Sequence, residues 1–210
     1  LKYNQTIFRK EYDHSTGEFT SPVKVEPRDF IVIAGLHPFY LPKLRKNIDL
    51  KIYIDTDETL RRHWKILRDT KKRGYDIENI LNQIEVRMND AKKYIYPQKG
   101  FADLILHFYP INKIKPGEYY KNIDLGLKVT FDASINVEKI LEKLNCKFIW
   151  DYNDDLNSQF IEFKTEPYDK FEYIAIDVID NIYELLDKDA KWNSGYNGFL
   201  QLLNLKLISE

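Results

Sequence analysis

The sequence predicts an α/β protein in which helices flank a mostly parallel sheet, followed by a C-terminal mixed α+β extension. In the first half, short apolar runs alternate with helical patterns, which is the rhythm of βαβ units. We expect a strand at residues 30–34, a helix at 41–47, a second strand at 50–54 and a second helix at 55–74. After residue 110 the strands show an alternation of apolar and polar side chains, typical of strands with one solvated face. We therefore expect two domains, an α/β core portion at 1–110 and a mixed extension at 111–210.

Composition sets limits on function and compartment. The 210 residues carry a net charge of −1, whereas a nucleic-acid-binding protein usually shows a basic excess. The single cysteine, Cys146, cannot form an internal disulfide, which fits a reducing compartment. No apolar run is long enough to cross a bilayer. We expect a cytoplasmic protein that binds neither nucleic acid nor membrane.

The apolar run from Phe30 to Ala34 predicts a strand that is buried on both faces, as in a parallel sheet covered by helices. Gly35 ends the strand, and the loop that follows contains His37. Ligands of open α/β sheets gather at the carboxyl ends of the strands, so His37 is a candidate ligand contact. It could equally be a loop residue that bonds to the backbone.

The segment from Asp55 to Gly74 predicts the helix around which the site is organised. Thr56 or Asp57 can cap its start, and Gly74 can end it. Three apolar side chains fall on one side of this helix and are expected to pack inward: Leu60, Trp64 and Leu67.

The same helix carries an unusual load of cations. Four of them recur at steps of four, three and four residues, so they project from one face: Arg61, Lys65, Arg68 and Lys72. Asp69 is the only acid between Arg61 and Arg73. We expect this face to bind an anion, and phosphate is the obvious one because guanidinium groups bind its oxygens in pairs. The alternative is a solvated basic surface helix.

The N-terminal segment predicts a hairpin, with strands at 6–12 and 19–25 and turn residues between them. Tyr12 and His14 flank Asp13, so in an extended chain both side chains point to the same side. A phenol hydroxyl beside an imidazole could hold a sugar hydroxyl or a phosphate. The alternative is a hairpin tip with ordinary polar residues.

The remaining elements carry no chemical constellation of their own. Asp76 can cap a further helix, on which Arg87 adds another cation. The rest of the chain predicts strands at 102–108, 124–131, 146–152 and 159–163 and helices at 137–144, 173–186 and 198–208.

Five stretches of the chain are similar, in this order, to the phosphoribulokinase/uridine kinase family of P-loop kinases. They are YDHSTGEF, FIVIAGLHPFY, LKIYIDTDETLRRHWKILRDTKKRGY, IEVRMNDAKKYIYPQKGFADLIL and, more weakly, NSGYNGFLQLLNLKL. The GLHP loop and the PQK segment resemble the phosphoribulokinase branch more than the uridine kinases. The resemblance implies a P-loop kinase-like sheet and an ATP-dependent phosphotransferase, with ATP and Mg²⁺ as cofactors and a sugar phosphate such as ribulose 5-phosphate as substrate.

The resemblance also implies roles for individual residues. The residues expected to bind the substrate are Tyr12, His14, His37 and Arg87. Those expected to contact phosphate and stabilise transition-state charge are Lys65, Arg68 and Arg73. Near the nucleotide, the PQK segment would place Gln98 and Lys99. Members of the family often dimerise, so a homodimer is a candidate assembly.

Two departures from the family pattern bear on activity. The motif G-x-x-x-x-G-K-[ST], which cradles nucleotide phosphates, does not occur. The resemblance places that motif and the proposed catalytic base upstream, so Leu1 is expected to follow a missing segment of the same polypeptide. The family has a glutamate that holds the metal or its water where this chain has Ala34, and a methyl group cannot coordinate magnesium. No residue of this chain is therefore expected to bind a metal, and its status as an enzyme stays open.

Three functions follow from these observations. The first is the substrate-binding and C-terminal portion of a sugar-phosphate kinase, in which Tyr12, His14 and the cations of residues 61–73 converge around one anion. The second is a degenerate homologue that binds a phosphorylated ligand or a protein partner without turnover, which Ala34 and the absent motif favour. The third is a nucleoside kinase, against which the number of cations argues.

Overall fold

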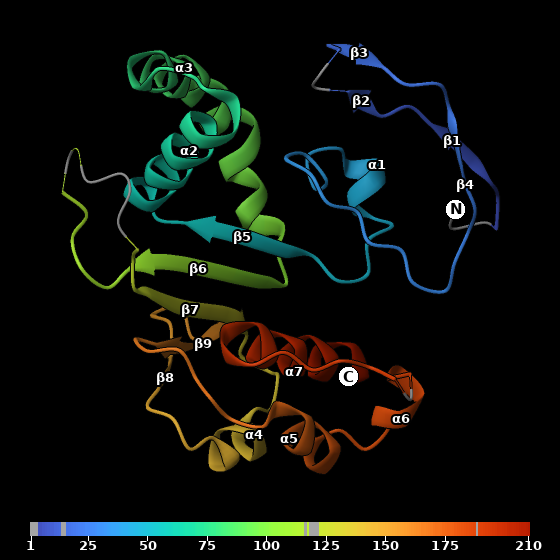
Figure 1. Ribbon diagram of the computed structural model, residues 1–210. Helices are drawn as coiled ribbons and strands as arrows, with labels where there is room; N and C mark the ends of the chain where they lie inside the picture. Colours follow the sequence, from blue (N-terminus) through green and yellow to red (C-terminus); the bar gives the residue numbers. More distant parts are fainter. Residues whose placement is uncertain (1–3, 14–15, 116, 118–121, 188) are drawn as a thin grey trace. The chain divides into compact units, whose positions relative to one another are not determined.

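The computed structural model describes residues 4–13, 16–115, 117, 122–187 and 189–210. The chain divides into two compact units, Leu1–Asp49 and Leu50–Glu210, and Figure 1 labels their helices and strands. Within the second unit, strands on either side of residue 110 pair in one sheet, and the domain boundary predicted there remains a prediction. Among the described residues, no helix combines the length and the apolar character needed to cross a bilayer.

The first unit consists of short strands and one short helix. Its elements are β1 (Ile7–Arg9), β2 (Tyr12–Asp13), β3 (Glu18–Phe19), β4 (Val23–Val25) and α1 (Pro42–Arg45). β1 pairs with β4 and β2 pairs with β3, both antiparallel. Gly17 lies in the turn with a φ of 76°, a conformation that glycine adopts without strain. The predicted N-terminal hairpin is confirmed, and the helix predicted at 41–47 is present as the shorter α1.

The strand predicted at Phe30 to Ala34 is wrong. The structure has no strand there, and the side chains are exposed, with Val32 at 92%. A continuous apolar run becomes a buried strand only where neighbouring strands and covering helices exist. The strands that the structure describes in this unit form two-stranded sheets, and neither sheet includes this run.

The second unit is built on a five-stranded mixed sheet in the order β5-β6-β7-β9-β8. Its strands are β5 (Ile52–Thr56), β6 (Leu104–Pro110), β7 (Leu125–Asp132), β8 (Ile149–Tyr152) and β9 (Ser158–Phe163). β5 and β6 are parallel and joined by a helical crossover, as the βαβ pattern predicts, whereas the other neighbours are antiparallel. The predicted α/β class, a sheet flanked by helices with a mixed C-terminal part, is confirmed, but the sheet is mixed where a mostly parallel one was predicted.

Helices form the crossover from β5 to β6 and most of the C-terminal part. They are α2 (Glu58–Arg73), α3 (Ile77–Asp90), a π-helical turn η1 (Ala91–Ile95), a 3₁₀ segment η2 (Tyr96–Phe101), α4 (Glu138–Lys143), α5 (Phe171–Val178), α6 (Ile182–Leu185) and α7 (Gly195–Ser209). The single helix predicted at 173–186 is wrong, because the backbone of Ile179 is extended, with a φ of −117° and a ψ of 106°. Val178 and Ile179 are both β-branched, and such side chains crowd the preceding helical turn.

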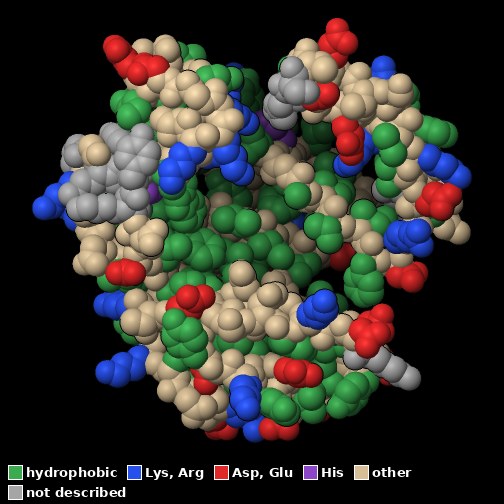
Figure 2. Space-filling model, viewed as in Figure 1, with side chains coloured by type: hydrophobic (Ala, Val, Ile, Leu, Met, Phe, Trp, Pro, Cys, Tyr) green, Lys and Arg blue, Asp and Glu red, His purple; other side chains and the backbone are tan. Residues whose placement is uncertain are grey.

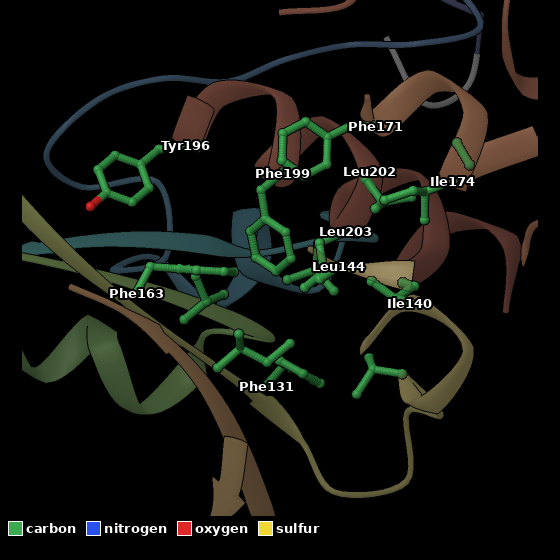
Figure 3. Close-up of a cluster of buried hydrophobic side chains, with 14 of the residues drawn as sticks. Phe131, Ile140, Leu144, Phe163, Phe171, Ile174, Tyr196, Phe199, Leu202 and Leu203 are labelled. Atoms are coloured by element: carbon green, nitrogen blue, oxygen red, sulfur yellow. The ribbon is translucent and has the colours of Figure 1, made fainter. Parts of the chain in front are cut away.

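One face of the sheet carries the main hydrophobic core. The side chains that point to it from β6, β7 and β9 are Leu104, Leu106, Leu127, Val129, Phe131, Ile161 and Phe163. α4, α5 and α7 cover this face (Figure 1). In Figure 3 the ring of Phe199 from α7 lies between those of Phe171 and Phe163, at centroid distances of 6.2 Å and 4.7 Å. The hydroxyl of Tyr196 donates to Leu125 O at 2.6 Å, which fixes α7 on the sheet.

The opposite face of the sheet is polar. In register across β5, β6, β7 and β9 lie Asp55, His107, Lys128 and Glu162. Tyr109 of β6 points to the same face, and its hydroxyl donates to Glu162. Its ring lies against Gly126, where an added Cβ would come within 2.3 Å of the ring. Glycine at this position of β7 therefore allows Tyr109 to reach across to β9.

Candidate functional site

Helix α2 begins and ends at residues that the sequence predicted. Asp57 is the N-cap, and its side chain accepts hydrogen bonds from the backbone N–H groups of Thr59 and Leu60. Gly74 ends the helix in the left-handed conformation, with a φ of 65°. Because β5 ends at Thr56, the helix starts at the carboxyl end of a parallel strand, where ligands of α/β proteins bind.

The buried side of α2 differs from the prediction. Its buried residues recur every three positions and are Leu60, His63, Ile66 and Asp69. Ile66 packs against Ile80 and Ile84 of α3. Trp64, which was predicted to pack inward, is exposed. A search for apolar periodicity does not find this stripe, because two of its four positions are polar. Its last member, Asp69, is fully buried, with 0% of the residue exposed.

Asp69 gathers the cations of the second half of α2. Lys65 Nζ lies 2.8 Å from Asp69 Oδ2, Arg68 Nε lies 2.8 Å from Oδ1, and Arg73 Nη1 lies 3.4 Å from Oδ1. We call these four residues the Asp69 cluster. The hydrogen bond from Arg68, with help from Lys65, outweighs the effect of burial and lowers the pKa of Asp69 to about 2. One negative charge faces three positive charges, so the cluster keeps an excess of two.

The cations of the Asp69 cluster remain accessible to a ligand. The side chain of Arg68 is 52% exposed and that of Lys65 is 16% exposed. Arg68 uses its Nε for Asp69, and the other N–H groups of its guanidinium can bind a phosphate oxygen. Figure 2 shows Lys and Arg side chains at the surface over α2. The three cations are therefore held in place by Asp69, and their role as an anion site remains a prediction.

The arginines in the first half of α2 are neutralised. Glu58 accepts hydrogen bonds from Arg61 Nε and Arg62 Nε, both at 2.7 Å. Arg62 also forms an ion pair with Glu85 of α3 at 2.7 Å. The sequence predicted that Arg61 shares a face with Lys65 as part of one anion site, but its partner is Glu58, three residues earlier. The excess charge is confined to the second half of the helix.

A second polar group lies where the carboxyl end of β5 pairs with the middle of β6. Asp55 Oδ2 contacts both Lys99 Nζ, at 2.7 Å, and His107 Nδ1, at 3.1 Å. Partial burial alone would raise the pKa of Asp55, but the hydrogen bond and charge of Lys99, together with His107, lower it. The ring of His107 stacks on Tyr109 at a centroid distance of 5.8 Å. The sequence reasoning missed His107. It lies opposite Asp55 through the register of the parallel pair β5 and β6, which the sequence alone does not give.

The predicted site residues of the first unit are accessible. Tyr12 on β2 is exposed, and its ring packs edge-on against Phe19 at a centroid distance of 5.3 Å. His37 lies in a loop, with its ring 6.2 Å from that of Tyr40. His14 lies outside the described residues. The convergence of these side chains with the cations of α2 on one anion remains a prediction.

The segment predicted to lie near a nucleotide is η2. Lys99 contacts Asp55 there, as described above. Gln98 is buried, and its Nε2 donates to Tyr94 O at 2.7 Å, so its amide closes the preceding helical turn. Arg87 is exposed on α3. Contacts of Gln98 and Lys99 with a nucleotide, and of Arg87 with the substrate, remain predictions.

Cys146 is not a candidate nucleophile. It is partly buried. Burial, and then the hydrogen bond of its thiol to Asp169, raise the pKa of Cys146 to about 12. Because the thiolate is the reactive form, this raised pKa disfavours reaction of Cys146 at neutral pH.

A model of the phosphoribulokinase/uridine kinase family matches residues 1–115, more than half of the chain. The chain belongs to this family. The matching part contains the Asp69 cluster, Lys99 and His107, so both polar groups fall within the family's own segment. The family expected from the sequence stretches is confirmed, and the four stretches within residues 1–115 lie in the matched part, whereas the weaker fifth stretch lies outside it.

Several members of the family are similar in sequence. The phosphoribulokinase of Synechocystis sp. is 41% identical over 118 residues, covering 56% of this chain and 36% of that protein. The chloroplastic phosphoribulokinase of Chlamydomonas reinhardtii is 36% identical over 123 residues, covering 58% of this chain and 33% of that protein. A uridine kinase of Clostridium botulinum is 39% identical over 85 residues, covering 40% of this chain and 41% of that protein. The chain spans about a third of the length of the phosphoribulokinases it matches.

The fold is also that of a solved structure in the family. The phosphoribulokinase from Rhodobacter spheroides superimposes with a TM-score of 0.54 at 19% sequence identity, covering 76% of this chain and 62% of that one. At this identity the likeness concerns the fold. Because it covers more of the chain than residues 1–115, it includes part of the C-terminal extension.

The family implies ATP and Mg²⁺, and the described residues do not by themselves fit either. No group of three or more His, Cys, Asp or Glu side chains that could hold a metal ion occurs among them. Ala34 ends an exposed segment, and its side chain has no oxygen to offer. The sequence has no G-x-x-x-x-G-K-[ST] motif for nucleotide phosphates. What the described residues do show is the excess of positive charge in the Asp69 cluster.

Proposed function

We propose that this chain is the substrate-binding and C-terminal portion of an ATP-dependent kinase that phosphorylates a sugar phosphate such as ribulose 5-phosphate. The observation that carries the proposal is the Asp69 cluster, in which three cations surround one fully buried carboxylate. Phosphoryl transfer needs positioning and charge neutralisation more than covalent chemistry, and such a cluster supplies both. The names of the phosphoribulokinase relatives support the same substrate class.

In this proposal each part of the chain has one task. Arg68 and Arg73 bind the phosphate of the substrate through their outer N–H groups, and Lys65 adds a point charge. Asp69 holds the three cations in position. The rest of the substrate would be bound by Tyr12, His14, His37 and Arg87. Lys99 and Gln98 would lie toward the nucleotide, which a further segment of the polypeptide would hold.

Two other functions each have one observation in their favour. Ala34, in place of the family's glutamate, favours a homologue that binds a phosphorylated ligand or a partner without turnover. The similarity to a uridine kinase favours a nucleoside as the substrate. A neutral nucleoside, however, gives no reason for an excess of two positive charges on α2.

The substrate class can be tested by thermal unfolding of the chain with ribulose 5-phosphate and with uridine. A ligand at a hundred times its dissociation constant should raise the melting temperature by roughly 5 °C or more. We expect ribulose 5-phosphate to do so and uridine to have a much smaller effect. Arg68→Ala should abolish the difference, whereas Arg62→Ala, whose guanidinium is already paired with two acids, should keep it. Equal shifts with both ligands would refute the assignment.

Catalysis is tested on the intact polypeptide. A kinase assay with a panel of pentose phosphates and nucleosides should show turnover of a pentose phosphate. Ala34→Glu should raise that turnover strongly if the other catalytic parts are intact. Ligand binding without any gain from Ala34→Glu would instead support the non-catalytic homologue.

A further inference from the structure

The exposed side of α5 carries apolar side chains between two acids. Its exposed residues are Glu172, Tyr173, Ile176 and Asp177, with Tyr173 at 63% and Ile176 at 39%. Successive residues of an α-helix are turned by about 100°, so Tyr173 and Ile176 lie between the two acids around the helix. The opposite side of α5 is buried in the main core. α5 therefore presents to solvent an apolar strip that has an acid on either side.

α6 follows α5 along the chain and has a similar composition at its exposed positions. Tyr183 is 77% exposed, and Glu184 next to it is also exposed. Only the short segment 179–181 joins the two helices. Figure 2 shows acidic and hydrophobic side chains next to one another in the lower part of the view, where Figure 1 places α5 and α6. We call the following six residues the α5–α6 face: Glu172, Tyr173, Ile176, Asp177, Tyr183 and Glu184.

The segment that contains this face is strongly acidic. Residues 170–187 include five acids and one lysine, whereas the whole chain has a net charge of −1. One of the acids has a cation from another helix, since Lys143 Nζ of α4 lies 2.7 Å from Asp177 Oδ2. Both partners are exposed, so this ion pair is weak and can be exchanged for another. Because negative charge remains in excess, a partner that is complementary to this face must be positively charged.

The exposed tyrosine rings favour one kind of cation. Lys170 Nζ lies over the ring of Tyr173, 5.6 Å from its centroid, so this ring already accepts a positive charge. A guanidinium group is planar and can stack on a tyrosine ring while its N–H groups bind a carboxylate in pairs. An ammonium group is a compact, strongly hydrated point charge without this stacking geometry. Tyrosine rings beside carboxylates therefore fit arginine better than lysine.

We propose that the α5–α6 face binds an arginine-rich segment of a partner protein. The guanidinium groups of that segment stack on Tyr173 and Tyr183 and pair with the neighbouring acids, while its aliphatic stems cover Ile176. An anionic membrane surface does not fit this face, because it would meet like charges. The proposal is independent of the proposed kinase function, since the face lies outside residues 1–115, which contain the cations of α2.

Fluorescence anisotropy of the whole chain with labelled peptides of six arginines or six lysines tests the proposal. At physiological salt the arginine peptide should bind about fivefold more tightly, because the two peptides carry the same charge and differ in stacking. Glu172→Lys should weaken binding of the arginine peptide about tenfold. Glu78→Lys, the same change at an exposed position of α3, is the matched control and should change it by less than about twofold. Equal losses from the two variants, or equal affinities for the two peptides, would overturn the proposal.

Removal of the rings separates stacking from charge. Tyr173→Ala combined with Tyr183→Ala should lower the affinity for the arginine peptide about fivefold and that for the lysine peptide by less than about twofold. Because both rings are exposed, the melting temperature should stay within about 3 °C of the wild-type value. Tyr75→Ala, which removes an exposed ring between α2 and α3, is the control and should leave both affinities unchanged.

Two further outcomes would overturn the proposal. One is a preference for arginine that survives the double tyrosine substitution. The other is self-association of the chain that Glu172→Lys weakens and Glu78→Lys does not, measured by sedimentation, because the face would then bind a second copy.

Discussion

The two halves of α2 carry the same kinds of cation but balance them differently. In the first half, Arg61 and Arg62 share Glu58, and Arg62 has a second acid in Glu85. In the second half, three cations share the single carboxylate of Asp69. The acids of the first half are partly exposed and that of the second is fully buried. The number of positive residues along a helix therefore does not show where its excess charge lies, because that depends on the positions of the acids.

The difference predicts different tasks for similar residues. Exposed pairs such as those of Glu58 contribute little to stability, because water and salt screen them. A buried carboxylate is costly unless its partners stay in place. The first half of α2 should tolerate substitution, whereas the second half should lose stability and anion binding together. Four experiments test this, from the largest expected effect to the smallest.

The largest effect should come from Asp69→Asn. The side chain keeps its size but loses its charge. The three cations of the cluster then have no carboxylate to pair with, and the buried amide has no ionic partner. We expect the free energy of unfolding to fall by about 3 kcal/mol or more, measured by urea denaturation. Asp90→Asn, an exposed acid at the end of α3, is the control and should change it by less than about 0.5 kcal/mol. A loss below about 1 kcal/mol for Asp69→Asn would show that the two halves do not differ.

Lowering the pH should remove the contribution that the charge of Asp69 makes to the free energy of unfolding. The pKa of Asp69 is lowered from 3.8 to about 2 by folding, so the ionised form is the one that stabilises the native state. Its contribution is complete above the unfolded pKa and is lost as the pH falls through the folded one. The stability difference between wild type and Asp69→Asn should therefore shrink by about 2 kcal/mol between about pH 5 and pH 2. Urea denaturation across this range measures it, and a constant difference would contradict the assignment.

The next largest effect should be a difference in anion affinity between variants in the two halves of α2. Arg68→Ala should weaken the binding of inorganic phosphate about tenfold, since it removes a charged donor that faces solvent. Arg62→Ala should change it by less than about twofold, because the guanidinium of Arg62 is already paired with Glu58 and Glu85. Calorimetric titration at low ionic strength measures both values. Equal losses from the two variants would mean that the anion binds along the whole helix.

The smallest effect should come from Glu85→Gln, which removes the ion pair between α3 and Arg62. Because this pair is partly exposed, we expect a loss of about 0.5 kcal/mol in the free energy of unfolding. Glu142→Gln on α4, an exposed acid, gives the baseline for removing one surface charge. A loss of more than about 2 kcal/mol would place the Arg62 pair on a level with the Asp69 cluster and end the contrast.

Those parts of the site that depend only on residues adjacent in the sequence could be predicted from the sequence. Asp57 and Gly74 bound α2 because capping and left-handed termination are local chemistry. The burial of Asp69 could not be predicted in this way, because it arises where α2 packs against the rest of the unit. The spacing of Asp69 to Lys65 and Arg73, four residues each way, was visible, but spacing does not say whether a carboxylate is in water or in the interior.

The strand predicted at Phe30 to Ala34 failed for the opposite reason. Its composition is that of a buried strand, but a strand exists only through the hydrogen bonds of its neighbours. The described residues of its unit supply none for this run. Asp55 and His107 show the complementary case, since residues 52 positions apart meet only because β5 and β6 align in one register. Local chemistry predicted the elements, and pairing decided which side chains meet.

The alkylation rate of the Cys146 thiol reports local opening of the structure next to β8. Since burial and Asp169 keep it protonated at neutral pH, iodoacetamide should label the native chain slowly and the denatured chain at the rate of an ordinary thiol. The ratio of the two rates then measures how often the corner before β8 opens, without any added probe.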